Sequence, residues 1–461
     1  MARVLERLDR LEQENRTLAG EVKALRAELA ASRGGGATTG GTTVAGGEAP
    51  LPNGRASTGS GSVTATGYAS GGSPSAASQE TAEATANATV EERVGINQTR
   101  IEEMAQTKVE ASQKFPVRLT GMALFNVFAN SKTSGGFDYP VIAAPTPGLG
   151  HSGASVRQTI IGLEFSGAPA IWGGHAHGSV YTDFFAGANN SAMRIRTVEV
   201  GIDWKTRSVA AGLEKPIFNP REPSSLAQVG ISPLTGAGNL WLWLPQVRVE
   251  QEIRFTGSTG LRAQIGAVQT REIGPYEGAI TPEAARPGLE GRFNFHHTFD
   301  DDRRVEFATG FHTSTTHAAG HSIPSSLYSF DWLMIPTKRL EFTGVFYSGQ
   351  NVAHLGSGTR QGYVVYGRYA RPIDSRGGWG QLTVHTLPRL DFHFFTGQVD
   401  DANRGLDRGA ISKNILYGGN SFFHVAPNVI VGLEATQVRT MYIGQGVRIN
   451  NHYDLALAYL F

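Results

Sequence analysis

Charged side chains recur at every second position in many short segments of this chain. In VRVEQEIRF (247–255), Arg248, Glu250, Glu252 and Arg254 alternate with apolar residues, so all four share one face of a strand. Guanidinium groups along one wall can bind carboxylates through paired, charge-assisted hydrogen bonds. The arginines can instead pair across strands with glutamates, of which the candidates are Glu199, Glu250, Glu252, Glu290 and Glu306. Both interpretations stay open, and together they predict a mixed field with a modest preference for anions.

The candidate selectivity residues are this polar register and the charges on and beside one long connection. They are Arg194, Arg196, Lys215, Arg221, Glu222, Arg248, Glu250, Glu252, Arg254, Arg262, Arg292 and Arg304. The connection is 218–245, FNPREPSSLAQVGISPLTGAGNLWLWLP, whose Pro, Gly and Leu content is typical of a packed loop folded inward. The alternative is an external surface loop.

Motifs for enzymatic or metal chemistry are weak. The HAH sequence at 175–177 places two imidazoles on one strand face, but no third ligand is identifiable, so histidines lining a lumen are the better interpretation. HTSTTHAAGH (312–321) indicates a loop with histidine at one edge, and FDDDRR (299–304) a tight polar turn rather than a calcium loop. No Gly-x-Ser-x-Gly occurs. We predict no catalytic residue, no metal and no cofactor.

The charged positions belong to segments that alternate between polar and apolar residues over residues 116–461. About 17 such segments are candidates for strands, 362–370 among them, and closed bacterial barrels take an even number, so 16 or 18 strands fit the pattern. Short turns such as 299–303 contrast with long connections near 130–154, 218–243, 271–287 and 397–410. This difference between connections is the pattern of an outer-membrane barrel.

Composition restricts the remaining classes. The 461 residues include 41 basic and 40 acidic side chains, 58 glycines and no cysteine, and no apolar run is long enough for a membrane-spanning helix. A net charge of +1 gives no basis for binding nucleic acid. A soluble β-sandwich would turn its charged face to water, whereas a membrane barrel turns its apolar face to lipid. The density of charge on successive strands favours an all-β, antiparallel transmembrane barrel.

The C-terminus, HYDLALAYLF, gives the most specific signal. Counting back from the last residue in steps of two gives a lipid-facing set, Phe461, Tyr459, Leu457, Leu455 and Tyr453, opposite Asp454, Ala456 and Ala458. A terminal Phe after such alternation resembles the sorting signal of bacterial outer-membrane barrels, which would make the barrel-assembly machinery a partner. An ordinary amphipathic last strand is the plainer interpretation.

The N-terminal part has a different organisation. Residues 1–33 predict a coiled coil with a heptad seam at Leu8, Leu11, Asn15, Leu18, Val22, Leu25 and Leu29. Residues 34–86, rich in Gly, Ser, Thr and Ala, predict a disordered linker. Residues 87–115 predict a periplasmic helix that leads to the barrel at 116–461. The start MARVLERLDR has no apolar core of a secretory signal, so we expect that such a signal has been removed or that the natural start differs.

The arrangement resembles the trimeric outer-membrane porins known as DcaP-like. The resemblance rests on the helix IEEMAQTKVEASQKF, the following PVRLTGMALFNVF and the terminal LALAYLF. It implies a 16-stranded barrel for small, often anionic solutes, preceded by a periplasmic helix. It also implies a homotrimer, whereas Asn15 in the coiled-coil seam favours a dimer.

These observations predict a passive, homotrimeric porin in the bacterial outer membrane, in contact with outer-membrane lipid, with its N-terminal region in the periplasm. Small hydrophilic solutes, carboxylates among them, would diffuse through a charged lumen. The alternative is a structural anchor whose coiled coil tethers the membrane to peptidoglycan or other envelope components. A trimeric adhesin would contribute only a few strands per chain, which the many segments contradict.

Overall fold

The computed structural model describes residues 117–186, 191–272 and 282–461. The predicted coiled coil (1–33), linker (34–86) and periplasmic helix (87–115), and with them the whole heptad seam, lie outside the described residues. Within the described ranges, no helix is long and apolar enough to cross a membrane.

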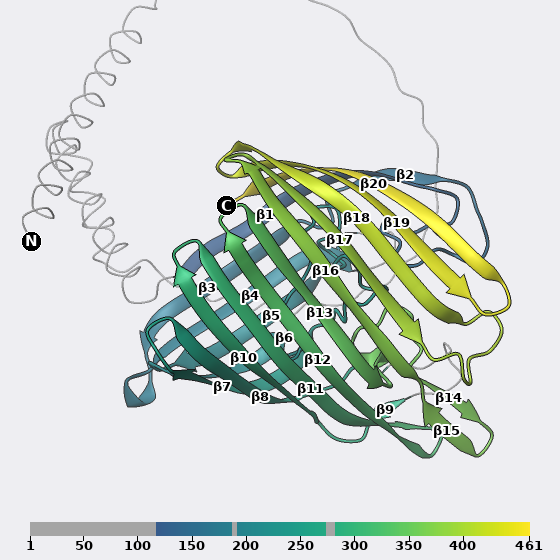
Figure 1. The fold of residues 1–461 in the computed structure, drawn as a ribbon, viewed down its shortest axis with the longest axis horizontal. Helices are drawn as coiled ribbons and strands as arrows, with labels where there is room; N and C mark the ends of the chain where they lie inside the picture. The colour runs from purple at the N-terminus through teal and green to yellow at the C-terminus, as the bar shows by residue number, and fades with distance from the viewer. Residues whose placement is uncertain (1–116, 187–190, 273–281) are drawn as a thin grey trace, which may run out of the picture. The chain divides into compact units, whose positions relative to one another are not determined.

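The described chain is built almost entirely of antiparallel strands (Figure 1). The first half contains β1 (Val117–Asn130), β2 (His151–Ser155), β3 (Ile160–Pro169), β4 (His175–Ala186), β5 (Ala192–Asp203), β6 (Arg207–Glu214), β7 (Leu244–Arg254), β8 (Thr259–Val268), β9 (Glu283–Ala284) and β10 (Gly288–Asp300). The second half contains β11 (Arg303–Ala318), β12 (His321–Thr337), β13 (Leu340–Gln350), β14 (Tyr363–Tyr366), β15 (Tyr369–Pro372), β16 (Asp374–Leu387), β17 (Leu390–Asp401), β18 (Ile411–Ala426), β19 (Val429–Tyr442) and β20 (Gly446–Leu460). Two 3-10 turns, η1 (Ile171–Gly173) and η2 (Ala353–Leu355), complete the elements.

The strands close into a 16-stranded barrel. The main sheet has 18 strands, but β2 and β3 pair with successive parts of β1, and β9 and β10 pair with the same strand, β11. Each of these two pairs therefore forms one side-by-side position in the barrel. Pairing of β1 with β20, from Met122 opposite Leu460 to Asn130 opposite His452, closes the ring. The predicted barrel and its even strand number are confirmed.

One predicted strand lies outside the ring. Segment 362–370 contains β14 and the start of β15, which pair only with each other in a two-stranded sheet. The prediction of a loop over 312–321 is wrong, because β11 continues to Ala318 and β12 begins at His321. Alternation of small polar residues, as in HTSTTHA, satisfies a strand as well as a loop, and the long pairing of β11 with β12 decides between them.

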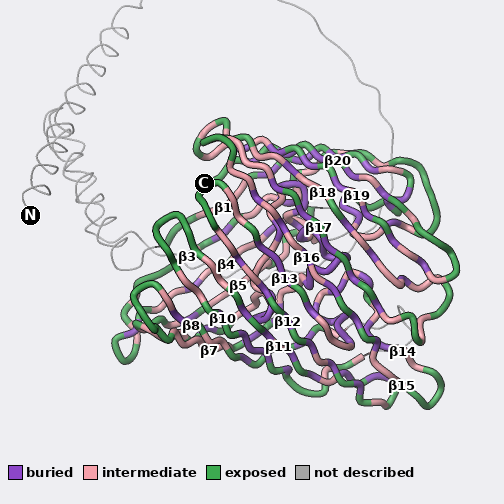
Figure 2. The backbone as a smooth tube through the Cα atoms, viewed as in Figure 1, coloured by how far each residue is buried: buried purple, intermediate pink, exposed green. Residues whose placement is uncertain are grey.

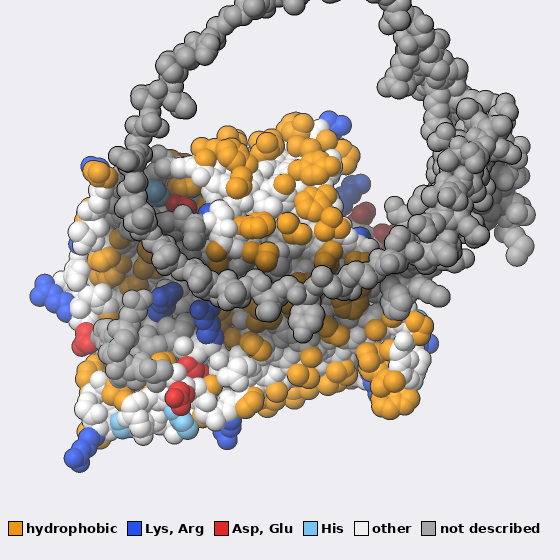
Figure 3. Space-filling view, turned by 180° about the vertical axis from the view of Figure 1, so that it is seen from behind, with side chains coloured by type: hydrophobic (Ala, Val, Ile, Leu, Met, Phe, Trp, Pro, Cys, Tyr) orange, Lys and Arg blue, Asp and Glu red, His pale blue; other side chains and the backbone are white. Residues whose placement is uncertain are grey.

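The outward surface of the strands is apolar. On β20, Tyr453, Leu455, Leu457 and Tyr459 are 45–57% exposed, whereas Asp454, Ala456 and Ala458 face inward and are buried. On β7, Val247, Val249 and Ile253 are likewise exposed, opposite the charged face. Exposed and buried residues alternate along most strands (Figure 2), and apolar side chains spread over the outer surface (Figure 3). The alternation thus has the sense of a membrane barrel, with apolar residues outside.

The connections sort by length to the two ends of the barrel. The end that holds the start of β1 and the end of β20 has short turns, such as 204–206, 301–302 and 338–339. The opposite end has long connections at 131–150, 215–243, 269–287 and 351–373, and short turns at 319–320 and 443–445.

Candidate functional site: a lumen narrowed by inward loops

The connection 215–243, between β6 and β7, lies inside the barrel. Its apolar side chains pack on inward-facing residues of distant strands, which buries Leu226, Leu234 and Leu240 almost completely. Leu226 contacts the cluster of Leu124, Ile430, Ala456 and Ala458. Leu234 belongs to the cluster of Ala143, Ala237, Val345, Trp379, Phe395, Leu416 and Val438. The structure therefore places the predicted constriction segment, with bounds shifted by about three residues, in the lumen rather than on the external surface.

Buried polar groups fix the tip of this loop. Gln158, fully buried next to β3, accepts hydrogen bonds from the backbone N–H groups of Val229 (2.8 Å) and Gly230 (2.7 Å). Its side-chain amide donates to the carbonyl of Ala227 (2.7 Å) and to Oδ1 of Asn126 (3.0 Å). One glutamine thus satisfies three backbone groups of a loop that has no regular secondary structure, as buried backbone groups require.

A second inward segment, 351–362, packs beside the first. Val352 and Leu355 share a buried cluster with Phe218, Leu240, Leu244, Leu327 and Tyr347. His354 is buried, with Nε2 3.3 Å from Oγ of Ser314 and Nδ1 3.7 Å from Oε2 of Glu272. Burial, and secondarily the neighbouring His312 imidazole, lowers the pKa of His354 to about 3. The imidazole is therefore neutral at ordinary pH.

The two inward loops cover one part of the inner wall and leave another part open to water. We call these parts the dry half and the wet half. Inward side chains on β13 and β16–β20 are mostly buried against loop residues. Most inward side chains on β3–β8 keep intermediate or greater exposure, as with Glu164, Tyr181, Arg248 and Glu250, although Asp183 and Gln246 are buried. Water-accessible volume inside the barrel therefore borders the β3–β8 wall, and it includes a pocket of about 430 Å³ at the short-turn end that Glu252, Arg254 and Arg262 help to line.

The candidate arginines face this lumen, and nearly all of them are paired. Arg194 (2.8 Å) and Arg196 (2.8 Å) bind the Asp183 carboxylate, and Arg248 pairs with Glu199. Arg262 lies 3.1 Å from Glu250 and 3.4 Å from Glu252. The remaining pairs are Lys215 with Glu222 (2.6 Å), Arg221 with Glu306 (2.5 Å) and Asp331 (3.2 Å), Arg292 with Asp331 (2.7 Å), and Arg304 with Glu306 (3.9 Å). Arg254, on the same face, is exposed, and no ion pair to it is found within the described residues.

Two carboxylates that organise these arginines did not stand out in the sequence. Asp183 and Asp331 are 0% and 1% exposed, and each holds two guanidinium groups. Asp331 lies on the inward face of β12 in the alternating run Leu327, Ser329, Asp331 and Leu333. A single acid at an inward position between Ser329 and Leu333 is the sequence signal that could have identified it. Asp331 connects the barrel wall to the inward loop, because it binds Arg292 on β10 and Arg221 in the loop.

An aromatic side chain of the loop, Trp243, packs against two of these arginines. The guanidinium carbons of Arg194 and Arg196 lie 5.0 and 4.9 Å from the ring centroid of Trp243, at the end of the inward loop. Cation–π attraction adds to the ion pairs with Asp183 and holds both guanidinium planes against the loop.

The histidines singled out in the sequence differ in their contacts and exposure. His177, on the inward face of β4, lies between Asp203 (2.9 Å) and Glu199 (3.2 Å), while His175 is exposed on the same face. His312 is buried on β11 between Glu290 (3.0 Å) and Ser314 (2.9 Å), and His317 is exposed. Among the described residues, no group of three or more His, Cys, Asp or Glu side chains is arranged to hold a metal ion.

The fold was compared with known proteins. No protein-family model and no curated protein sequence matches the chain. Among solved structures, the outer membrane channel DcaP of Acinetobacter baumannii superposes with a TM-score of 0.63 at 15% identity, over 76% of this chain and 98% of that one. An anion-selective porin from Comamonas acidovorans superposes with a TM-score of 0.50 at 10% identity, over 75% of this chain and all (100%) of the porin. The predicted resemblance to the DcaP-like barrel is thereby confirmed at the level of the fold: the described chain has the fold of an outer-membrane porin.

Proposed function

We propose that this protein is a passive porin of the bacterial outer membrane, through which small hydrophilic solutes diffuse. The observation that carries the proposal is the division of the inner wall. Apolar packing of the loops makes one half dry, while the β3–β8 half keeps charged, half-exposed side chains. A packed plug would bury charge on both halves, whereas a filter needs water and charge beside a rigid constriction.

The charge pattern supports a weak preference for anions. Most arginines on the wet wall already bind carboxylates, so few positive groups remain free to attract a solute anion. Arg254 adds positive charge at the short-turn end of the lumen, whereas the exposed Arg118 pairs with Glu164. A solute carboxylate would therefore bind an arginine by displacing the carboxylate side chain that is already paired with it.

Planar-bilayer recordings test this proposal directly. Purified protein is expected to form water-filled channels whose reversal potential in a salt gradient indicates weak anion selectivity. Arg248→Glu combined with Arg254→Glu reverses two lumen charges and should abolish or invert that preference. Arg368→Glu, in the turn between β14 and β15 outside the barrel, is the matched control and should leave it unchanged. Absence of channels, or cation selectivity of the unmodified protein, contradicts the proposal.

The proposal includes a homotrimer with residues 1–115 on the periplasmic side and the long connections on the outer side. The distribution of long and short connections, which follows that of outer-membrane barrels, supports this orientation, and the homotrimer follows from the resemblance of the sequence to DcaP-like porins. Conductance steps in groups of three and a trimer mass in detergent are the expected results. A mass corresponding to a dimer would instead support the coiled-coil interpretation based on Asn15.

A further inference from the structure

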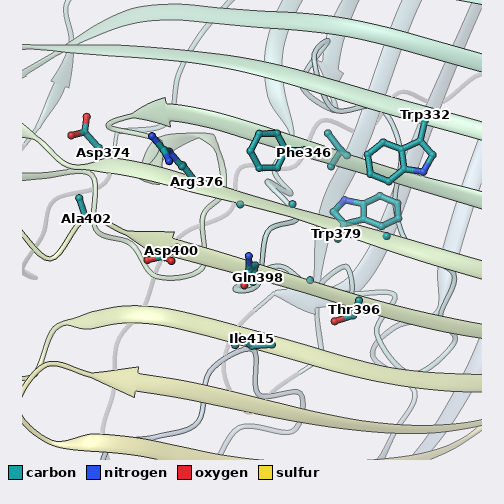
Figure 4. Close-up of a pocket in the computed structure, with 15 residues that line it drawn as sticks. Trp332, Phe346, Asp374, Arg376, Trp379, Thr396, Gln398, Asp400, Ala402 and Ile415 are labelled. Carbon is teal, nitrogen blue, oxygen red and sulfur yellow. The ribbon is translucent and has the colours of Figure 1, made fainter.

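A groove of about 880 Å³ runs along the outside of the barrel over β12, β13, β16 and β17 (Figure 4). Trp332 lies at one end of it, Phe346 near the middle, and Asp374, Arg376 and Asp400 toward the other end. These side chains face away from the lumen, because they alternate with the buried inward residues of their strands. The groove therefore faces the surroundings of the barrel, not the solute path.

The strand register gives this groove a gradient of polarity. Toward the long connections, one outward row is Ser348, Arg376, Asp400 and Lys413, with Gln350 and Asp374 in the row beyond it. Two rows further toward the short turns, the outward residues are Gly344, Gly380, Thr396 and Tyr417, and the next row is Phe342, Leu382, Phe394 and Gly419. Gly380 lies four residues from Arg376, roughly 13 Å along the strand. One site thus offers charge at its outer end and apolar surface toward the middle of the membrane.

Glycines form the floor of the apolar part. The Trp332 ring lies over Gly344, where a Cβ atom would come within 2.4 Å of it. At Gly380, by contrast, the nearest atoms to a Cβ would be 3.9 Å away, so the space above this glycine is open. The open floor beside the Trp332 and Phe346 rings is shaped for a hydrocarbon chain rather than for bulk water.

At the charged end of the groove, one arginine side chain has no partner among the described residues. Lys413 pairs with Asp400 (2.6 Å), and Arg404 lies 3.5 Å from Asp374. No ion pair or hydrogen bond of the Arg376 guanidinium is recorded among the residues that the structure describes, and the side chain is exposed. Arg439, outward on β19, donates to Gln437 (2.7 Å) and contacts no carboxylate there. Both carboxylates at this end are thus already engaged, and Arg439 is held by Gln437 and the Tyr417 ring, while the Arg376 guanidinium is free to bind an anion.

We propose that this groove binds a phosphorylated lipid of the outer leaflet. An acyl chain would lie on the glycine floor between Trp332 and Thr396, and the phosphate would accept hydrogen bonds from Arg376. Guanidinium groups bind phosphate in a bidentate geometry, and the distance between the two ends of the groove matches a ligand with a polar head and an apolar tail. The inference rests on the proposed orientation, with the long connections on the outer side of the membrane.

Lipid binding to delipidated protein tests the inference without any measurement of current. Native mass spectrometry in detergent would follow titration with diphosphoryl lipid A, for the unmodified protein and for Arg376→Glu and Gly380→Phe. We expect each variant to weaken binding at least about tenfold, because a hydrogen bond to a charged group or the chain-binding floor is lost. The matched controls are Arg368→Glu and Ala267→Phe, an outward residue on β8, and they should stay within about twofold.

Four results would overturn the inference. They are equal binding by Arg376→Glu and its control, full binding by Gly380→Phe, equal binding of a dephosphorylated lipid, and displacement of the lipid by inorganic phosphate at equal concentration. Loss of the oligomer in both variants, with no lipid bound to the unmodified protein, would instead assign the groove to a second copy of the chain. Arg376→Gln and Gly380→Leu are milder replacements if the first variants fail to fold. Channel recordings of the same preparations separate a failure of this site from a failure of the proposed pore.

Discussion

Replacing Asp331 by Asn removes the charge that joins the inward loop to the barrel wall. Asp331 is 1% exposed and accepts hydrogen bonds from Arg292 at 2.7 and 2.8 Å and from Arg221 at 3.2 Å. The variant leaves the guanidinium of Arg292, itself 5% exposed, without a counter-charge in a buried site. Breaking a buried ion pair from one side costs about 3–5 kcal/mol. Arg221 keeps Glu306 as a second partner, so we expect the loss to fall mainly on Arg292.

Equilibrium guanidinium unfolding in detergent, followed by tryptophan fluorescence, measures this loss. The matched control is Asp300→Asn, which removes an exposed pair with Arg303 in the turn between β10 and β11 and should leave the transition unchanged. Loosening of Arg221 should also raise the noise of the open-channel current. An unfolding free energy of Asp331→Asn equal to that of the Asp300 control would refute the reasoning, because it would mean that the buried pair contributes nothing to holding the wall together.

Two further predictions concern the anchoring of the inward loops. Burial holds the pKa of His354 at about 3 in the folded protein, against 6.5 in the unfolded chain. The unfolded chain therefore binds more protons below pH 6.5, and His354 alone lowers the stability by about 2 kcal/mol between pH 7 and pH 5. Unfolding curves at the two pH values should show a drop smaller by about this amount in His354→Asn, and an unchanged drop would contradict the prediction. Gln158→Leu deletes four hydrogen bonds at the loop tip and should cost about 2–4 kcal/mol; hydrogen exchange should then accelerate at Val229 and Gly230, and protection as in the unmodified protein would argue against this anchor.

The barrel could be predicted from the sequence because its signal is local. Alternation along VRVEQEIRF and HYDLALAYLF assigns each residue to one of two faces, and the structure keeps those faces, with Val247 and Leu455 outside and Arg248 and Asp454 inside. The same alternation in 362–370 predicts a barrel strand where the structure has the hairpin of β14 and β15. A hairpin outside the ring has the same alternation as a barrel strand, and only its pairing distinguishes them.

The lumen was predictable only in part. Charge in the polar register identified the wall that faces water, and the composition of 218–245 indicated an inward loop. The partners of these charges depend on contacts between residues far apart in the chain, such as Arg221 with Asp331 and Arg248 with Glu199. The second inward segment, 351–362, carries no charge pattern, and its burial follows from packing against Phe218 and Leu240 of the first loop.

Cysteine accessibility measures the division of the lumen most directly, because the chain has no cysteine of its own. Ser179 faces inward on the wet half, on β4, and Val438 faces inward on the dry half, 2% exposed under the loop. We predict that a charged thiol reagent added during bilayer recording reduces the current of Ser179→Cys and leaves that of Val438→Cys unchanged. Block at Val438→Cys with none at Ser179→Cys would contradict the central claim that solutes pass along the β3–β8 wall.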